Sequence, residues 1–263
     1  MLVINVEVFA AQKLPPISCG LHNGWMRIAE EVTQEIGVDV DFTVKGIVAE
    51  SRRVYPLGSD TKVLSTIFEI LTRPVLARIA LRHGLIVEEA HQTVYPDFTL
   101  YRDKNDRKKI AIDVKTTYRR PTIAYTLGSY TSFLRNNTKN ILYPYDQYAQ
   151  HWIIGFAYDR CQVTSPRESY GLDELDEIQV PYKCVEFFVQ QKYRIAGDRP
   201  GSGNTRNIGS IKSKDIEDFR RGNGPFATHG EDVFRAYWAN FGKDSQRPYN
   251  TLTEFLTWQH RNK

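Results

Sequence analysis

Charged side chains inside apolar runs constrain the fold of this chain most strongly. Residues 95–101 read YPDFTLY, residues 110–117 read IAIDVKTT, and a polar turn separates them. Both runs alternate in polarity, which predicts two neighbouring strands joined as a hairpin. Because side chains alternate between the two faces of a strand, Asp113 and Lys115 point to the same face. If the strands pair, Asp97 joins them there.

Two carboxylates and an ammonium on one face of a sheet indicate either a metal site beside a phosphate or a structural ion pair. Charges within an apolar run are costly to bury unless they are paired or bound to metal. The chain has two further D-x-K triplets, at 60–62 and 106–108, although such a triplet should occur roughly once by chance in a chain of this size. We expect Asp60 to cap a helix and the second triplet to be solvated in the hairpin turn. The pattern alone leaves both interpretations open.

Length and composition are those of an ordinary soluble globular protein. The chain has 263 residues, with 41% hydrophobic and 25% charged side chains, which suffices for one large domain or two small ones. A net charge of +4 is compatible with a polyanionic partner but does not identify one. Cys19, Cys161 and Cys184 form no C-x-x-C pair, which favours a reducing compartment without a thiolate zinc site. The sequence contains no apolar run long enough to span a membrane and no basic region typical of a signal peptide.

Apolar periodicity predicts a chain that mixes helices and strands. A helix should follow Asp60, with Pro74 breaking it or restarting it as a first-turn residue, and a further segment ending at Gly84. By the same pattern, Glu69 in this helix should face solvent. The other predicted helices lie at 24–36, 231–241 and 252–261, with a helix opening at 144–150, and the other predicted strands at 2–9, 38–48, 85–87, 152–158 and 185–195.

Two polar segments have more than one interpretation. Residues 127–139 contain glycine, arginine, asparagine and lysine side chains that could line a phosphate backbone, but an exposed loop is the default expectation. Residues 197–209 form a glycine- and asparagine-rich loop that lacks the spacing of nucleotide-phosphate loops. This loop is either a flexible surface segment or one whose glycines let the backbone approach a ligand closely.

Several stretches of the chain resemble one family. Pro96-Asp97 followed by Asp113-Val114-Lys115 resembles the PD-(D/E)-x-K nuclease signature. The longer stretches at 55–69, 95–101, 109–118, 130–140 and 196–210 resemble the EcoRV family of type II restriction endonucleases. The resemblance extends from about Trp25 to the C-terminus, so residues 1–24 are expected to be an N-terminal extension of unknown role and residues 25–263 a single domain.

The resemblance implies an α/β fold, a mixed sheet flanked by helices, with a DNA-binding cleft formed by a homodimer. It also implies a Mg²⁺-dependent endonuclease of a restriction-modification system, cytoplasmic in a prokaryote, with a cognate DNA methyltransferase in the host and no membrane partner. Members of the family cut double-stranded DNA at the centre of the palindrome GATATC, which leaves blunt ends with 5′-phosphates.

Site residues follow from the same resemblance. Asp97, Asp113 and Lys115 correspond to the catalytic trio, and Glu69 to an acidic helix residue; Asp97, Asp113 and Glu69 would bind the metal. The expected DNA contacts are Gly201, Ser202, Gly203, Asn204, Thr205, Arg206 and Asn207 in a major-groove loop, Gln92 and Thr93 in a minor-groove loop, and Thr117, Lys139 and Lys62.

Three positions depart from the family pattern. Arg206 stands where the family has a threonine, and a cation there could add a phosphate contact or alter base readout. His91 and Thr93, on either side of Gln92, replace a glutamine and an asparagine. Two alternatives remain beside a restriction enzyme: a structure-selective repair or junction nuclease on the same scaffold, and a DNA-binding relative without catalysis.

Overall fold

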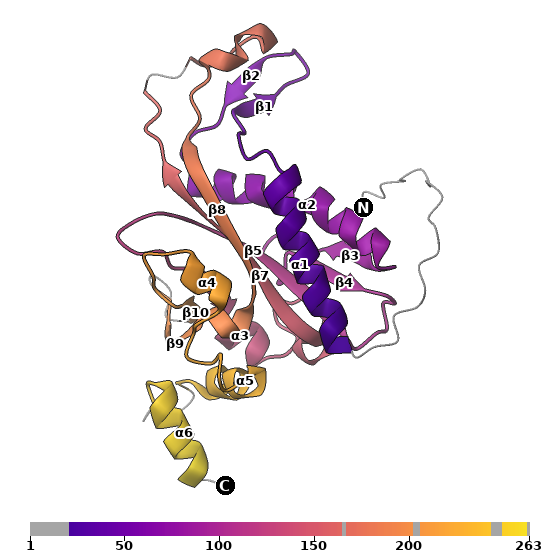
Figure 1. Ribbon diagram of the computed structural model, residues 1–263, viewed down its shortest axis with the longest axis vertical. Coiled ribbons are helices and arrows are strands. Elements are labelled where there is room, and N and C mark those ends of the chain that lie inside the picture. Colours follow the sequence, from indigo (N-terminus) through magenta and orange to yellow (C-terminus); the bar gives the residue numbers. More distant parts are fainter. Residues whose placement is uncertain (1–20, 165–166, 202–205, 243–248, 262–263) are drawn as a thin grey trace.

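The computed structural model describes residues 21–164, 167–201, 206–242 and 249–261. The strand predicted at 2–9 lies outside these ranges. A five-stranded mixed sheet with helices packed against it forms the body of the molecule, as the family resemblance implied (Figure 1). Within the described ranges, every helix is too short or too polar to cross a membrane.

The central sheet has the strand order β3-β4-β5-β7-β8. Its strands are β3 (Ile86–Glu89), β4 (Phe98–Tyr101), β5 (Lys109–Tyr118), β7 (Tyr148–Arg160) and β8 (Tyr182–Gln191). Strands β4 and β5 are antiparallel, with Phe98 opposite Ile112, which confirms the predicted hairpin. Strand β7 lies parallel to β5, with Ile153 beside Asp113, while the remaining neighbours are antiparallel.

Helices α1 (Leu21–Asp39) and α2 (Thr61–Arg82) cover one face of this sheet (Figure 1). Phe68 of α2 packs in the same apolar core as Ile112 of β5. Asp60 caps α2 as predicted, since its carboxylate accepts hydrogen bonds from the backbone N–H groups of Lys62 and Val63 at 2.8 and 3.3 Å.

The prediction that Pro74 breaks or restarts α2 is wrong, because the helix continues through it to Arg82. Pro74 removes one N–H from the hydrogen-bond ladder, which leaves the carbonyl of Ile70 without that partner. Ile70 lies on the exposed side of the helix, where water can hydrate its carbonyl. Buried Phe68 and Val75 hold both halves of the helix on the sheet.

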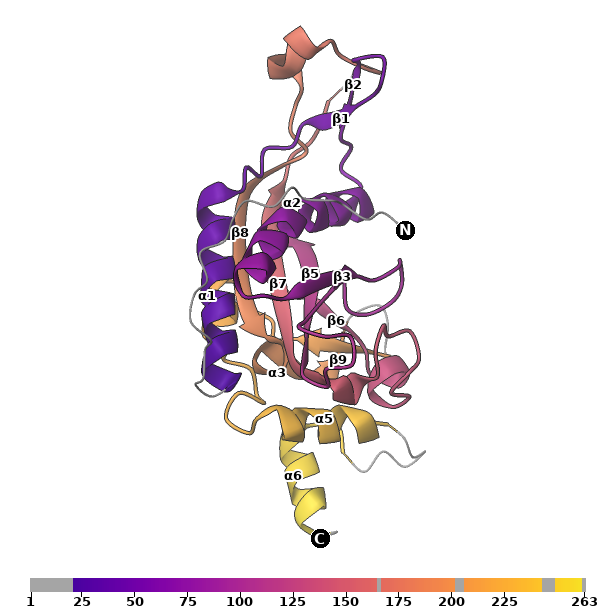
Figure 2. The same cartoon turned by 90° about the vertical axis from the view of Figure 1, so that its right-hand side faces the viewer.

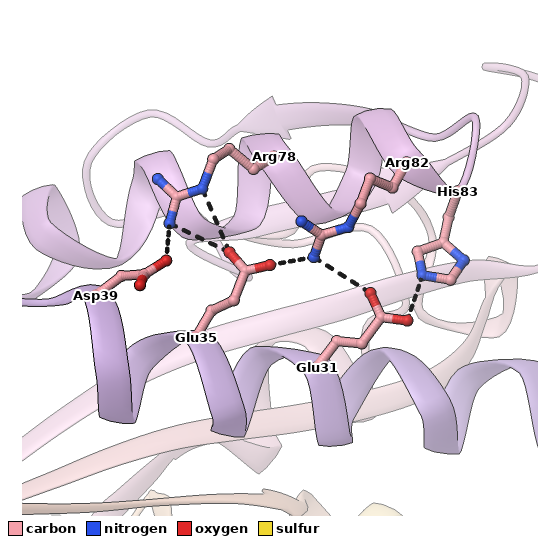
Figure 3. A network of polar contacts seen from close by, with 6 residues as sticks. All are labelled: Glu31, Glu35, Asp39, Arg78, Arg82 and His83. Carbon is pink, nitrogen blue, oxygen red and sulfur yellow. Dashed lines mark hydrogen bonds and ion pairs between the residues drawn. The ribbon is translucent and has the colours of Figure 1, made fainter. Parts of the chain in front are cut away.

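A network of charged side chains joins α1 to the C-terminal half of α2 (Figure 3). Glu35 pairs with both Arg78, at 3.1 Å, and Arg82. Arg82 also lies 3.3 Å from Glu31, which is 3.0 Å from His83 Nε2. Most of these side chains are partly exposed, so each pair should contribute about 0.2–1 kcal/mol. The network fixes the spacing of the two helices.

A second sheet of order β6-β10-β9 lies against the other face of the central sheet. Its strands are β6 (Thr126–Ser129), β9 (Ala196–Pro200) and β10 (Asn207–Ser210), and the helices beside it are η1 (Tyr130–Leu134), α3 (Lys192–Ile195), α4 (Glu217–Arg221), α5 (Glu231–Asn240) and α6 (Leu252–Arg261). Buried Ile153, Phe188 and Trp238 belong to the core between them. The helices predicted at 231–241 and 252–261 are confirmed.

Three predictions on this face need correction. The strand predicted at 185–195 ends at Gln191, and α3 follows. The exposed loop expected at 127–139 contains β6 and η1 instead, with buried Tyr130 and Phe133. The helix expected at 144–150 is one short turn, η2 (Tyr145–Gln147). Each segment is shaped by packing against a distant part of the chain, which local periodicity does not report.

An arm extends from the body at the end opposite α6 (Figure 2). It consists of β1 (Gly46–Val48), β2 (Val54–Pro56) and η3 (Leu172–Glu177). The strand predicted at 38–48 is therefore much shorter than expected. Val54, Tyr170 and Ile178 form a small core of their own in this arm.

Candidate active site

Strand β5 places Asp113 and Lys115 on the face of the central sheet opposite α1 and α2. Ile110, Ile112 and Val114, which alternate with them, lie in the core beneath those helices. Lys115 Nζ lies 2.7 Å from Asp113 Oδ2, which confirms that the two side chains share a face. Asp113 is buried and Lys115 is partly exposed, so the pair lies at the floor of an open site.

Asp97 joins this pair from the segment that precedes β4. Its Oδ2 accepts a hydrogen bond of 2.6 Å from the backbone N–H of Val114. The same oxygen lies 4.0 Å from Lys115 Nζ. Asp97 is thus held against the central strand by a backbone contact, and the three charged groups predicted from the hairpin converge.

Burial and the charge of Asp113 raise the pKa of Asp97 to about 8. Burial opposes protonation of Lys115, but the carboxylates of Asp113 and Asp97 outweigh it and raise the pKa of this lysine. The two carboxylates therefore repel one another, and Lys115 compensates only part of that repulsion. Hard oxygen donors in such a pair are the ligands that Mg²⁺ prefers. The residues present fit a divalent cation.

Glu69 lies on α2 and is partly buried, so the pattern-based expectation that it faces solvent is wrong. Burial raises its pKa, with smaller effects from the charges of Lys115 and Asp113. Within the part of the chain that the structure describes, no three His, Cys, Asp or Glu side chains form a group that could hold a metal. Asp97 and Asp113 converge there as a pair, and Glu69 lies outside the cavity that they line.

A cavity of about 250 Å³ opens above the three charged groups. Its lining consists of Thr93, Val94, Tyr95, Asp97, Asp113, Lys115, Gly128, Ser129, Ser132, Phe133 and Asn140. Ser129, Ser132, Phe133 and Asn140 are members that sequence reasoning did not select individually. The resemblance at 130–140 was the available signal for Ser132, Phe133 and Asn140, whereas nothing marked Ser129 individually.

The structure describes the two ends of the predicted recognition loop, Gly201 on one side and Arg206 and Asn207 on the other. Gly201 N–H donates a 2.9 Å hydrogen bond to the carbonyl of Asn207, which joins the ends of the predicted recognition loop. Residues 202–205, with Ser202, Gly203, Asn204 and Thr205, lie outside the described residues. The backbone carbonyl of Arg206 accepts hydrogen bonds from Tyr130 N–H at 3.2 Å and from Ser129 Oγ at 3.3 Å. The loop therefore begins and ends beside the wall of the cavity.

The remaining predicted contacts differ in whether they line the cavity. Thr93 lines the cavity, and Gln92 precedes it in an exposed turn. Lys139 is exposed and is followed by cavity-lining Asn140. Thr117 is partly exposed on β5, two residues beyond Lys115, whereas Lys62 is exposed in the first turn of α2 and lies outside the cavity lining. The structure brings Thr93 to the trio but not Lys62.

A mixed sheet flanked by helices, with Asp97, Asp113 and Lys115 at the floor of an open cavity, is consistent with the restriction-endonuclease fold. The family model for restriction endonuclease EcoRV matches residues 38–260 of this chain. The type II restriction enzyme EcoRV of Escherichia coli is 52% identical over 228 residues, which cover 84% of this chain and 92% of that protein. This chain belongs to the EcoRV restriction endonuclease family and is a type II site-specific deoxyribonuclease.

Proposed function

We propose that this protein is a Mg²⁺-dependent homodimeric endonuclease that cuts duplex DNA at GATATC or a related palindrome. The cut is central and blunt, and it leaves 5′-phosphate and 3′-hydroxyl ends. The enzyme acts in the cytoplasm of a prokaryote whose own sites a cognate DNA methyltransferase protects. Residues 25–263 form the single catalytic domain, and residues 1–24 are an extension.

The observation that carries this proposal is the convergence of two carboxylates and one ammonium in an open cavity. Lys115 Nζ lies 2.7 Å from Asp113 Oδ2 and 4.0 Å from Asp97 Oδ2. A structural ion pair alone needs one carboxylate per ammonium, and the second carboxylate raises the electrostatic cost. Because the two carboxylates and one ammonium are unfavourable without a bound metal ion, the arrangement supports a role in metal-dependent chemistry.

In the proposed mechanism, Asp97 and Asp113 would hold the metal, and Glu69 is the third acidic residue that the family resemblance assigns to it. A bound Mg²⁺ supplies Lewis-acid polarisation of the scissile phosphate and lowers the pKa of a bound water. Lys115 places its positive charge beside the attacking water and the phosphoryl oxygens, which stabilises the transition state. The backbone N–H of Val114 keeps Asp97 against β5, so the two carboxylates stay aligned.

Recognition is assigned to residues on both sides of the cavity. Residues 201–207, including Gly201, Arg206 and Asn207, read bases in the major groove, where each good bidentate contact contributes about 1–3 kcal/mol of discrimination. Gln92 and Thr93 approach the minor groove. Thr117, Lys139 and Lys62 contact the DNA elsewhere. The closeness of Thr93 to the trio, and of the loop ends to the cavity wall, supports this assignment.

The homodimer is supported by the surface of the arm. Ile47, Val48, Tyr55, Leu172 and Leu175 are large apolar side chains that are 40–60% exposed there. An exposed apolar patch of this kind is typical of an interaction surface. A twofold dimer would present the same recognition loop to each half of a palindrome, since protein and site then share one symmetry.

Digestion of DNA of known sequence tests the proposal. With Mg²⁺, the wild-type protein should give discrete fragments whose mapped ends define one palindrome, and Asp113→Ala should reduce the rate on the order of 1,000-fold. Asp106→Ala is the matched control, because Asp106 belongs to the D-x-K triplet of the hairpin turn, outside the cavity. Light scattering of the intact protein should give twice the mass of one chain.

Other outcomes would support different functions. Preferential cutting of branched or mismatched duplexes over plain duplex would favour a repair or junction nuclease. Tight sequence-specific binding without cutting at any divalent-metal concentration would favour a catalytically inactive relative. A smear of fragments from plain duplex would contradict sequence-specific cleavage.

A further inference from the structure

Lys192 is a buried lysine outside the trio of Asp97, Asp113 and Lys115. It lies between strands β9 and β10, which form the recognition hairpin, and residues 95–97, the catalytic segment. Lys192 is the first residue of α3, which connects β8 to β9. Its side chain is 1% exposed, and its Nζ has no hydrogen-bond partner within the described residues. An amine buried in this way is costly, and a methionine would fill similar space without that cost. The position therefore needs a reason beyond packing.

Two aromatic rings receive the Lys192 ammonium. Nζ lies 4.4 Å from the ring centroid of Tyr95 and 4.7 Å from that of Phe133. The two rings are themselves stacked, with centroids 4.4 Å apart. Gly128 leaves the room for this arrangement, because a Cβ there would lie 2.7 Å from the Phe133 ring and 3.9 Å from Lys192 Nζ. Burial lowers the pKa of Lys192 to about 7, and in its protonated form the amine makes cation–π contacts with both rings.

One ring belongs to the catalytic segment. Tyr95 precedes Asp97 by two residues, and its hydroxyl is hydrogen-bonded to Nδ1 of buried His151 at 2.7 Å. Backbone bonds to Asn140 and Leu142 hold the same residue from the other side. Tyr95 is thus anchored to the segments that carry His151 and Asn140, and only Pro96 separates it from Asp97.

The other ring and the lysine backbone belong to the recognition side. Phe133 lies in η1, directly after β6, and β6 pairs with β10 through Ser129 and Asn207. The backbone of Lys192 continues into β9, which ends at Pro200 next to the recognition loop. Lys192 and the rings of Tyr95 and Phe133 therefore connect both strands of the recognition hairpin to Tyr95 and Pro96, which precede Asp97.

We propose that Lys192 is a positioning residue that couples the recognition hairpin β9–β10 to Asp97 by clamping the rings of Tyr95 and Phe133. This inference rests on the proposed function, since it assigns Asp97 to the metal and residues 201–207 to DNA. Lys192 touches neither substrate nor metal in this scheme. It acts through the two rings, which hold Asp97 in register with Asp113 and Lys115.

Lys109 provides a matched control. Its side chain is also buried, at 0% exposed, and its Nζ also lies over two rings, 5.8 Å from Tyr101 and 4.4 Å from Tyr143. It lies on the same strand β5 as the catalytic residues but at the opposite end, outside the cavity lining. Lys109→Met therefore removes a buried ammonium from an aromatic pair at the far end of β5, together with its hydrogen bonds to the carbonyl of Asp106 and to Oε1 of Gln147.

The test compares the wild-type protein, Lys192→Met and Lys109→Met. Calorimetric titration with Mn²⁺ should show binding about tenfold weaker in Lys192→Met, because Asp97 loses its alignment, and a change below about twofold in Lys109→Met. With Mg²⁺, the single-turnover cleavage rate of Lys192→Met should fall about tenfold or more, with DNA affinity measured without metal changed by less than about threefold. Phe133→Leu should likewise slow cleavage while it leaves the metal-free DNA affinity nearly unchanged. It replaces Lys192→Met in the test if that variant does not fold.

Two results would overturn the inference. Mn²⁺ binding and cleavage by Lys192→Met equal to those of Lys109→Met would exclude a positioning role. If the DNA affinity of Lys192→Met falls in proportion to its cleavage rate, Lys192 only stabilises the recognition hairpin and does not position Asp97. If the wild-type protein binds Mn²⁺ but cuts no DNA, the proposed function fails, and Mn²⁺ binding by the variants still decides the inference. If the wild-type protein does not bind Mn²⁺, both are overturned.

Discussion

Replacement of Asp97 by asparagine should stabilise the metal-free protein while it abolishes cleavage. Asparagine keeps a carbonyl oxygen that can accept the hydrogen bond from Val114 N–H, which is 2.6 Å long in the wild-type protein. It removes the negative charge that burial and Asp113 oppose. Function and stability should therefore respond in opposite directions at this position.

The size of the effect follows from the pKa of Asp97, which is about 8 in the folded protein against an ordinary value of 3.8. At pH 7 the folded state retains a proton that the unfolded chain has released, which costs about 4 kcal/mol. Asparagine has no such cost. The pKa of about 8 already includes the attraction of Lys115, which lies 4.0 Å from Asp97 Oδ2. We therefore expect a gain on the order of 4 kcal/mol and a rise in Tm of about 10 °C.

The sign of the pH dependence is part of this prediction. Because the folded pKa is raised, the contribution of Asp97 to stability falls as pH rises from about 4 to about 8, and it levels off above the folded pKa. The stability difference between Asp97→Asn and wild type should thus be small at pH 4 and grow to a plateau above pH 8. The assay is urea unfolding followed by circular dichroism at several pH values, with EDTA present throughout.

Mg²⁺ provides a second comparison for the same pair of proteins. It should raise the Tm of the wild-type protein, because bound metal relieves the carboxylate repulsion, and it should have a much smaller effect on Asp97→Asn. The reasoning would be refuted by a variant that is less stable than wild type at pH 8, or by a stability difference that does not change with pH.

Further predictions concern the scaffold and the cavity. Asp60→Ala should cost about 1 kcal/mol of stability, measured by thermal unfolding, because two backbone amides of the first turn of α2 lose their acceptor. Glu35→Gln should cost about 1 kcal/mol in low salt through its lost pairing with Arg82, and the cost should shrink in 1 M NaCl. Gly128→Ala should slow cleavage more than it weakens DNA binding, since the glycine has φ of +89° and a Cβ would lie 2.7 Å from the Phe133 ring; equal effects on both would contradict this.

Local periodicity was enough to predict the hairpin that carries the candidate active site. The alternation of residues 110–117 places Asp113 and Lys115 on one face because the side-chain period of a strand depends on backbone geometry alone. The cap at Asp60 was predictable for a similar reason, as it involves only neighbouring residues. The resemblance to a nuclease family then assigned a function to a pattern that was equally compatible with an ion pair.

The walls of the site depended on tertiary structure. Ser129 and Ser132 come to the cavity because β6 and η1 pack against β10, which lies about eighty residues later in the chain. Asn140 comes there because its carbonyl accepts a hydrogen bond from Tyr95 N–H. Helix α2 passes through Pro74 because the sheet beneath it holds both halves, which outweighs a local preference to break.

The burial of Lys192 is a further feature that the sequence did not indicate and the tertiary structure decided. In the sequence it stands at the end of a predicted strand, with nothing to distinguish it from an exposed lysine. The fold buries its ammonium over Tyr95 and Phe133, whose segments meet only after the two sheets have packed. The sequence by itself therefore determined which strands carry the chemical groups. Tertiary packing decided which side chains hold those groups in place, because contacts between distant segments leave no periodic signal.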